Sequence, residues 1–177
     1  MRRVIYLLPL ILVAVVVVGL AIPILEKRDP SKLPSALINK PVPSFDLAGL
    51  RAGEARFKSD ELPKKPILLN VFSSWCAPCR AEIPRLIGLR KEGIAVYGLA
   101  YKDDPAATLN FLARFGDPYE RIGIDRDGRI GIEFGVYGVP ETYVVDGEGK
   151  IRLRYAGEVT DHVVETQIRP LLAELSK

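Results

Sequence analysis

Apolar and polar residues alternate along the 177-residue chain in patterns that predict its central elements. Residues 66–74 and 94–101 are near-continuous apolar runs, typical of buried parallel strands. A helical repeat lies between them, carried by Ile83, Leu86, Ile87 and Arg90. Gly93 is placed to end this helix. Strand, helix and strand predict a βαβ unit, whose crossover is almost always right-handed.

The following residues predict a second helix and a hairpin. Asp103 or Asp104 can cap a helix that has Pro105 at its first position. Its expected core residues are Leu109, Leu112 and Phe115. Residues 141–146 and 150–157 flank a glycine-containing turn, which predicts an antiparallel β-hairpin. In its second strand apolar residues alternate with Arg152 and Arg154, so we expect one buried and one solvated face.

The C-terminal residues predict a closing helix that Pro170 should bend. Its apolar positions are Val164, Ile168, Leu171, Leu172 and Leu175. A βαβ unit followed by a β-hairpin and a helix is the plan of the thioredoxin fold.

The N-terminus carries an uncharged run from Val4 to Leu25, directly after Arg2 and Arg3. A helix needs about 20 apolar residues to cross a bilayer. Residues 1–25 are therefore predicted to be an uncleaved membrane anchor with its N-terminus inside. A cleavable signal peptide is the alternative, although its apolar core would run about 7–15 residues. Either reading places the remaining residues outside the cytoplasm.

The rest of the chain is predicted to be a linker, residues 26–40, and one domain, residues 41–177. A domain of this length can bury a sizeable core, and we expect it to be monomeric. The formal charge of +3 falls to +1 without Arg2 and Arg3. A nearly neutral domain gives no electrostatic reason to bind nucleic acid.

The only two cysteines lie in the stretch FSSWCAPCR, residues 72–80. A structural zinc site needs four Cys or His ligands, and only the distant His162 could add one. A structural disulfide across two residues would close a very short loop and add little stability. Cys76 instead follows a strand and opens a helix, where free N–H groups and the dipole favour a thiolate. We therefore expect Cys76 to attack and Cys79, more buried, to resolve the mixed disulfide, with no cofactor.

WCAPC in this topology resembles the thioredoxin superfamily. Three further stretches narrow the resemblance, namely FDLAGL (45–50), GDPYERIGID (116–125) and GVYGVPETYVVD (135–146). With the N-terminal segment, they resemble the membrane-anchored thiol:disulfide interchange proteins of cytochrome c maturation.

The resemblance implies a thioredoxin-like α/β fold, a central mixed sheet flanked by helices, preceded by one transmembrane helix. It also implies a reductase on the periplasmic side of the inner membrane. The substrate would be apocytochrome c, or a thiol-disulfide carrier of it, and a membrane protein would supply the electrons.

Five residues around the dithiol are candidate site residues, and four of them have a plainer alternative. Pro140 matches a cis-proline that faces the cysteines, rather than an ordinary trans proline. Asn70 stands where thioredoxins carry a buried aspartate. Glu82 and Glu141 resemble acids grouped around the dithiol, rather than solvated surface acids. Trp75 would cover the site and contact partners, or simply pack.

Three other functions stay open from the sequence. The chain could be a less selective periplasmic reductase or oxidase. The cysteine pair could carry Cu(I), which would make the protein a metallochaperone. The protein could also be a tethered adaptor whose dithiol is incidental.

Overall fold

The computed structural model describes residue 9, residues 11–19 and residues 35–176. The chain divides into two units, Met1–Leu33 and Pro34–Lys177. Residues 11–19 are helical. Among the described residues, no helix has the length and apolar character needed to cross a membrane. The predicted anchor (1–25) and linker (26–40) lie largely outside the described residues and stay predictions.

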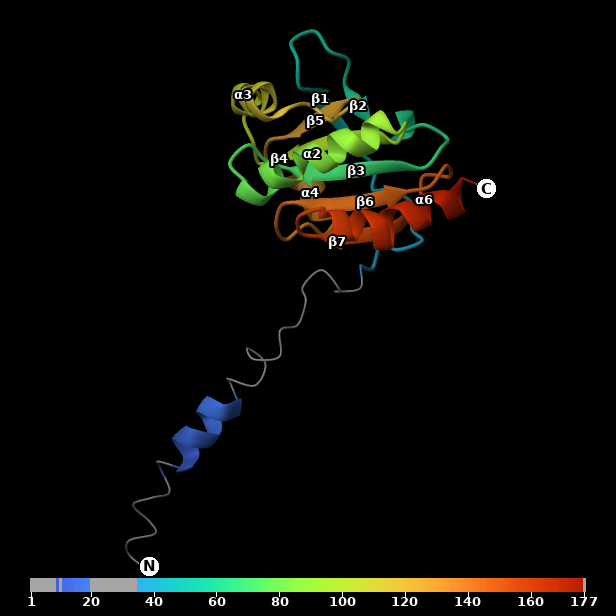
Figure 1. The fold of residues 1–177 in the computed structure, drawn as a ribbon. Helices are drawn as coiled ribbons and strands as arrows, with labels where there is room; N and C mark the ends of the chain where they lie inside the picture. The colour runs from blue at the N-terminus through green and yellow to red at the C-terminus, as the bar shows by residue number, and fades with distance from the viewer. Residues whose placement is uncertain (1–8, 10, 20–34, 177) are drawn as a thin grey trace, which may run out of the picture. The chain divides into compact units, whose positions relative to one another are not determined.

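One mixed seven-stranded sheet organises the larger unit (Figure 1). Its strands are β1 (Asp46–Gly49), β2 (Phe57–Lys58), β3 (Ile67–Phe72), β4 (Ala95–Tyr101), β5 (Ile122–Asp125), β6 (Glu141–Val145) and β7 (Ile151–Ala156). They are ordered β2-β1-β5-β4-β3-β6-β7. The β3–β4 and β4–β5 pairs are parallel, and the remaining pairs are antiparallel. The predicted βαβ unit and β6–β7 hairpin are confirmed.

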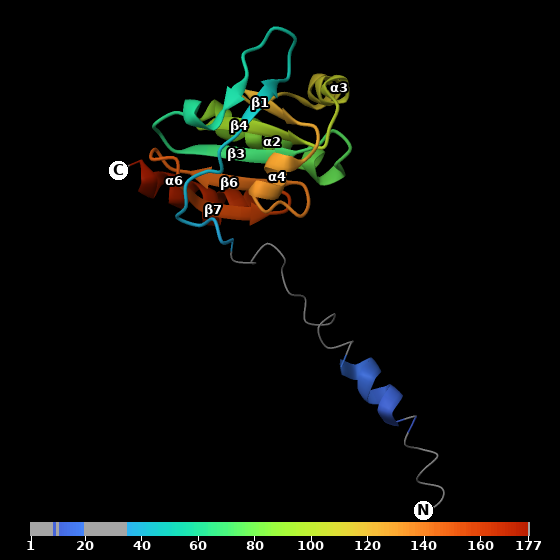
Figure 2. The ribbon, with the colours of Figure 1, turned by 180° about the vertical axis from the view of Figure 1, so that it is seen from behind.

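Helices cover both faces of the sheet. On one face, α2 (Ala77–Lys91), α3 (Pro105–Phe115) and the C-terminal helices enclose one apolar cluster with β3 and β4. Figure 1 shows α2 and α6 in front of the sheet, and the reverse view in Figure 2 brings α4 (Arg129–Glu133) to the front. A second apolar cluster lies on that reverse face. The flanked mixed sheet that the resemblance implied is present.

The α3 helix begins as predicted, and two of its three expected core residues are confirmed, because Leu112 is buried and Phe115 packs against the same cluster. Asp104 is the N-cap, because its carboxylate accepts a hydrogen bond from the N–H of Ala106. Leu109 is exposed, however, whereas Phe111 and Leu112 are buried against the sheet. The prediction for Leu109 is wrong because the stripe that faces the sheet runs through Thr108, Phe111 and Leu112.

The closing helix is confirmed in its core positions and interrupted in its middle. It comprises α5 (Asp161–Val163), a π-helical turn η3 (Val164–Ile168) and α6 (Arg169–Leu175). Pro170 has no N–H to donate to the carbonyl four residues earlier, so the regular α-helical pattern fails at this place. Val164, Ile168 and Leu172 are buried in the cluster that also contains both cysteines.

Candidate active site

The dithiol lies where β3 passes into α2. Cys76 is the N-cap residue of α2, and its Sγ accepts a hydrogen bond from the N–H of Cys79 at 3.1 Å. The two cysteines form a disulfide. Cys76 retains 6 % exposure and Cys79 only 1 %, the order expected for an attacking and a resolving thiol. The helix N-terminus supplies an N–H donor that can stabilise negative charge on Cys76 after reduction.

A cis peptide bond forms the opposite wall of the site. The Val139–Pro140 bond is cis, as the resemblance implied, and it directly precedes β6. The carbonyl oxygen of Val139 lies 3.5 Å from the Sγ of Cys76. This backbone is thus within reach of any chain bonded to Cys76.

Exposed aromatic side chains lie on the segments that border the dithiol. Trp75 is 63 % exposed, and its indole N–H donates to the carbonyl of Lys102 at 3.4 Å. Tyr137, three residues before Pro140, is also exposed. Trp75 and Cys76 contribute to the lining of a hollow of about 140 Å³ that reaches Phe111 and Phe115 on α3. Trp75 is therefore available to contact a partner and is not part of the buried core.

Asn70 and Glu82 form a buried polar chain beneath the cysteines. The Asn70 side-chain nitrogen donates to Glu82 Oε1 at 2.8 Å and to Thr142 Oγ1 at 3.0 Å. The Tyr119 hydroxyl donates to the Asn70 side-chain oxygen at 2.7 Å. The second oxygen of Glu82 accepts the N–H of Val159 at 2.9 Å. Glu82 is fully buried, so the alternative of a solvated helix-surface acid is wrong.

Burial sets the acidity of Glu82. Removal from water raises its pKa from 4.5 to about 7, against the opposing hydrogen bonds from Val159 and Asn70, and the charge of Glu158 adds to the increase. Glu82 is three residues after Cys79, and side chains at this spacing are neighbours on a helix. The site thus holds, one helical turn from Cys79, an acid that can take up or release a proton near neutral pH.

Glu141 lies on the other face of the sheet. In the β3–β6 register Thr142 is opposite Asn70, whereas Glu141 is opposite Val71. Successive strand residues point to opposite faces, so the Glu141 side chain points away from the face that carries Asn70 and α2. The expectation that Glu141 groups with the dithiol is therefore not met. It is not a solvated strand-edge acid either, because it is 1 % exposed.

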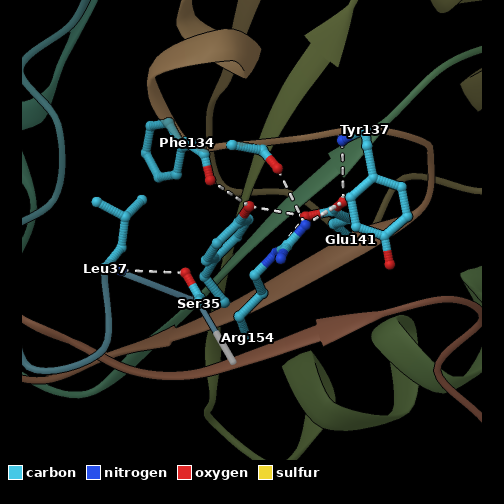
Figure 3. A network of polar contacts seen from close by, with 8 residues as sticks. Ser35, Leu37, Phe134, Tyr137, Glu141 and Arg154 are labelled. Atoms are coloured by element: carbon cyan, nitrogen blue, oxygen red, sulfur yellow. Dashed lines mark hydrogen bonds and ion pairs between the residues drawn. The ribbon is translucent and has the colours of Figure 1, made fainter. Parts of the chain in front are cut away.

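Arg154 of β7 neutralises Glu141 (Figure 3). Its Nε and Nη2 donate to the two oxygens of Glu141, each at 2.8 Å. The predicted solvated position of Arg154 is wrong, since its side chain is only 9 % exposed. One signal in the sequence could have predicted this ion pair. An acid and a base occur on the two adjacent strands of the predicted hairpin, and Arg154 is two residues away from the position directly opposite Glu141.

The same network fastens the segment that leads to the cis-proline. Arg154 Nη2 also donates to the carbonyl of Gly135 at 3.0 Å, and the N–H of Tyr137 donates to Glu141 at 3.3 Å. The Tyr143 hydroxyl donates to Glu141 at 2.8 Å and lies 3.1 Å from the carbonyl oxygen of Phe134. Figure 3 shows the contacts from Arg154 and Tyr137 meeting at the Glu141 carboxylate. Glu141 thus supports one wall of the site from behind.

Asp103 has a role that the sequence did not reveal. Its carboxylate accepts the N–H of Ser74 at 2.6 Å, the Ser74 hydroxyl at 2.7 Å and the Thr108 hydroxyl at 3.0 Å. These bonds hold the turn that immediately precedes Trp75 and Cys76. The sequence pattern indicates only a helix cap at Asp103 or Asp104, and that role belongs to Asp104.

Among the described residues, no three His, Cys, Asp or Glu side chains are grouped so that they could hold a metal ion. The chemistry that the site offers is thiol–disulfide exchange. A nucleophilic sulfur lies at a helix N-terminus, a second sulfur is within bonding distance, and a buried acid lies one turn away.

Comparisons with known proteins agree with this chemistry. Residues 37–168 match the family model described as Redoxin. The chain is 43 % identical, over 99 % of its length and 96 % of the relative, to the thiol:disulfide interchange protein DsbE of Pseudomonas aeruginosa. It is 46 % identical, over 84 % of its length and 85 % of the relative, to the thiol:disulfide interchange protein HelX of Rhodobacter capsulatus.

A solved structure supports the fold independently. The crystal structure of a DsbF homologue from Corynebacterium diphtheriae superimposes with a TM-score of 0.65, covering 81 % of this chain and 96 % of the other. The two sequences are 21 % identical, so this likeness concerns the fold alone.

Proposed function

The chain belongs to the DsbE-type thiol:disulfide interchange proteins of the redoxin family, and from this premise we propose that it is the reductase of cytochrome c maturation. Its substrate is a disulfide in apocytochrome c or in a thiol-disulfide carrier of it. Reduction of that disulfide frees the thiols that receive haem. The observation that carries the proposal is Cys76 at the N-terminus of α2, beside Cys79 and the cis Val139–Pro140 bond.

The reaction has two steps. The Cys76 thiolate attacks one sulfur of the substrate disulfide, a mixed disulfide forms, and the second substrate sulfur leaves as a thiolate. Cys79 then loses its proton and attacks Cys76. The Cys76–Cys79 bond forms, the mixed disulfide breaks, and the first substrate sulfur leaves as a thiolate. Two electrons have passed to the substrate, and the protein is in the oxidised form that the structure contains.

The surrounding residues have distinct parts in these steps. Glu82 receives the proton of Cys79, because it is buried one helical turn away and its pKa lies near neutrality. The backbone at Val139 pairs with the substrate chain as an additional strand, beside the Sγ of Cys76. Trp75 contacts the partner through its exposed ring.

The sequence pattern supports a location at the outer face of the cytoplasmic membrane. Residues 1–25 anchor the chain, residues 26–40 form a linker, and the domain of residues 41–177 lies in the periplasm. A membrane protein returns electrons to the oxidised dithiol. Alkaline carbonate extraction of isolated membranes tests the anchor: the full-length chain should stay in the membrane pellet. Recovery of a shortened chain in the soluble periplasm would mean that the N-terminal segment is a cleaved signal peptide.

Trapping of the mixed disulfide tests the function. Full-length Cys79→Ala should accumulate a disulfide-linked complex in cells that make c-type cytochromes, because nothing can resolve the bond at Cys76. Non-reducing gels and mass spectrometry should identify apocytochrome c, or its carrier, linked through a haem-attachment or carrier cysteine.

Cys76→Ala is the matched control, and it should trap far less. Equal trapping by the two variants would reverse the roles assigned to the cysteines. A Cys79→Ala complex that contains neither a cytochrome precursor nor its carrier would overturn the proposed substrate.

A further inference from the structure

We propose that Tyr119 is a positioning residue of the dithiol site: its hydroxyl holds the Asn70 amide in the one orientation that directs N–H donors at the Glu82 carboxylate. This inference deepens the proposed function and rests on it for the role of Glu82. Tyr119 comes from the segment between α3 and β5, far in sequence from both cysteines.

The Asn70 amide has two chemically different ends, and each has a defined neighbour. Its nitrogen faces Glu82 at 2.8 Å and Thr142 at 3.0 Å, and its oxygen faces the Tyr119 hydroxyl at 2.7 Å. The Thr142 hydroxyl can donate or accept, so it tolerates either orientation of the amide. An ionised Glu82 only accepts, and therefore it requires the nitrogen. Tyr119 contacts the opposite end of the Asn70 amide, and its hydrogen bond to the amide oxygen favours the same orientation.

The hydroxyl of Tyr119 keeps its proton and needs an acceptor for it. Tyr119 is 4 % exposed, and its ring stacks on Phe72 with centroids 4.6 Å apart. Burial, with the nearby charges of Glu82 and Asp117, raises its pKa well above the ordinary value of a phenol. If the Asn70 amide were reversed, its N–H could donate to the Tyr119 oxygen, but the Tyr119 proton would lose the acceptor that it has in this structure, and a buried donor would be left unsatisfied. Tyr119 therefore favours the orientation that stabilises the Glu82 carboxylate.

Other groups around Glu82 do not replace this contact. The Val159 N–H binds the second carboxylate oxygen. Glu158 opposes ionisation of Glu82, and Arg85 approaches Glu158 at 3.8 Å. Cys79 lies one turn earlier on α2. None of these groups binds the Asn70 oxygen, whose only hydrogen bond in the described part of the chain comes from Tyr119.

Tyr119→Phe tests the inference because it removes one oxygen and keeps the ring. Without the hydroxyl the amide can turn its oxygen toward Glu82, which favours the protonated acid. Carbon-13 NMR of labelled glutamate in the full-length protein should show the Glu82 titration moved upward by about one pH unit. The pH profile of the step in which Cys79 resolves the mixed disulfide should move in the same direction.

Two further variants distinguish the positioning of Asn70 by Tyr119 from a general loss of packing. Tyr97→Phe removes a different hydroxyl, which donates to Glu120 at 3.1 Å, and should leave both profiles unchanged. In a Glu82→Gln background, Tyr119→Phe should no longer alter the pH profile of the resolving step. A Glu82 titration that coincides in wild type and Tyr119→Phe would overturn the inference. Because the NMR titration needs no substrate, this failure is distinct from failure of the proposed function.

Discussion

Glu82 is an ionisable residue held in a site that disfavours its charge. Its pKa is about 7 in the folded protein and 4.5 in the unfolded chain, so the folded state binds more protons between these values. The free energy of unfolding should therefore fall, from this group alone, as pH rises from about 4.5 to 7. The loss is on the order of 2–3 kcal/mol.

Glu82→Gln should remove this part of the pH dependence, whatever constant offset the substitution adds. Urea unfolding of the two proteins at a series of pH values measures the difference in slope. Glu158→Gln is a useful control, because it removes only a minor contribution to the acidity of Glu82. Parallel pH profiles for wild type and Glu82→Gln would contradict the assignment.

The residue scale also shows what the sequence could and could not predict about the site. The cysteine pair was found because its spacing, its place after an apolar strand and its resemblance to a family all agree. The orientation of Glu141 was not predictable, since it depends on the β3–β6 register, which no local pattern specifies. Tyr119 was visible only as a member of a matching motif. Its contact with Asn70 joins residues 49 positions apart.

At the scale of elements, the β6–β7 hairpin and the segment 134–140 behave as one structural unit. The buried Glu141–Arg154 pair lies at their junction. Arg154→Ala would leave a buried carboxylate without its charge partner, and such a loss costs about 3–5 kcal/mol. Chemical denaturation should show this decrease, and Glu141→Gln combined with Arg154→Leu should recover part of it.

Arg152→Ala is the matched control on the same strand. Arg152 pairs with Asp146 at 3.2 Å but is 36 % exposed, so its loss should cost no more than about 1 kcal/mol. An equal decrease in the free energy of unfolding for the two substitutions would show that the buried Glu141–Arg154 pair stabilises the fold no more than the exposed Arg152–Asp146 pair.

Element prediction succeeded where apolar runs were long and failed where they were short. The β3 and β4 strands, of six and seven residues, and the 15-residue α2 were recognised from their patterns. The strands β1, β2 and β5 have four, two and four residues, too few for a period to be detected. These short strands form because neighbouring strands offer backbone N–H and C=O groups that need hydrogen-bond partners. This pairing depends on the tertiary structure, so the local sequence gives little indication of it.

At the scale of the whole molecule, the proposed function requires a dithiol that reduces other proteins in an oxidising compartment. Two features of the site act in opposite directions on its potential. The α2 N-terminus stabilises a Cys76 thiolate and hence the reduced form, whereas a buried carboxylate at Glu82 disfavours further negative charge. We expect the second effect to hold the reduction potential of the full-length protein below roughly −200 mV, in the range of thioredoxins and glutaredoxins.

The fluorescence of Trp75 can measure this reduction potential, because Trp75 is the only tryptophan and directly precedes Cys76. Its fluorescence, followed in the full-length protein equilibrated with dithiothreitol or glutathione buffers, should report a single two-electron transition. The protein with both cysteines changed to alanine should give no transition, which shows that the signal comes from the dithiol. A value near −120 mV, typical of a strong oxidant, would mean that the protein makes disulfides. The two outcomes differ by more than 80 mV, which is about a 500-fold difference in the equilibrium with any substrate dithiol, so the direction of electron flow would be decided.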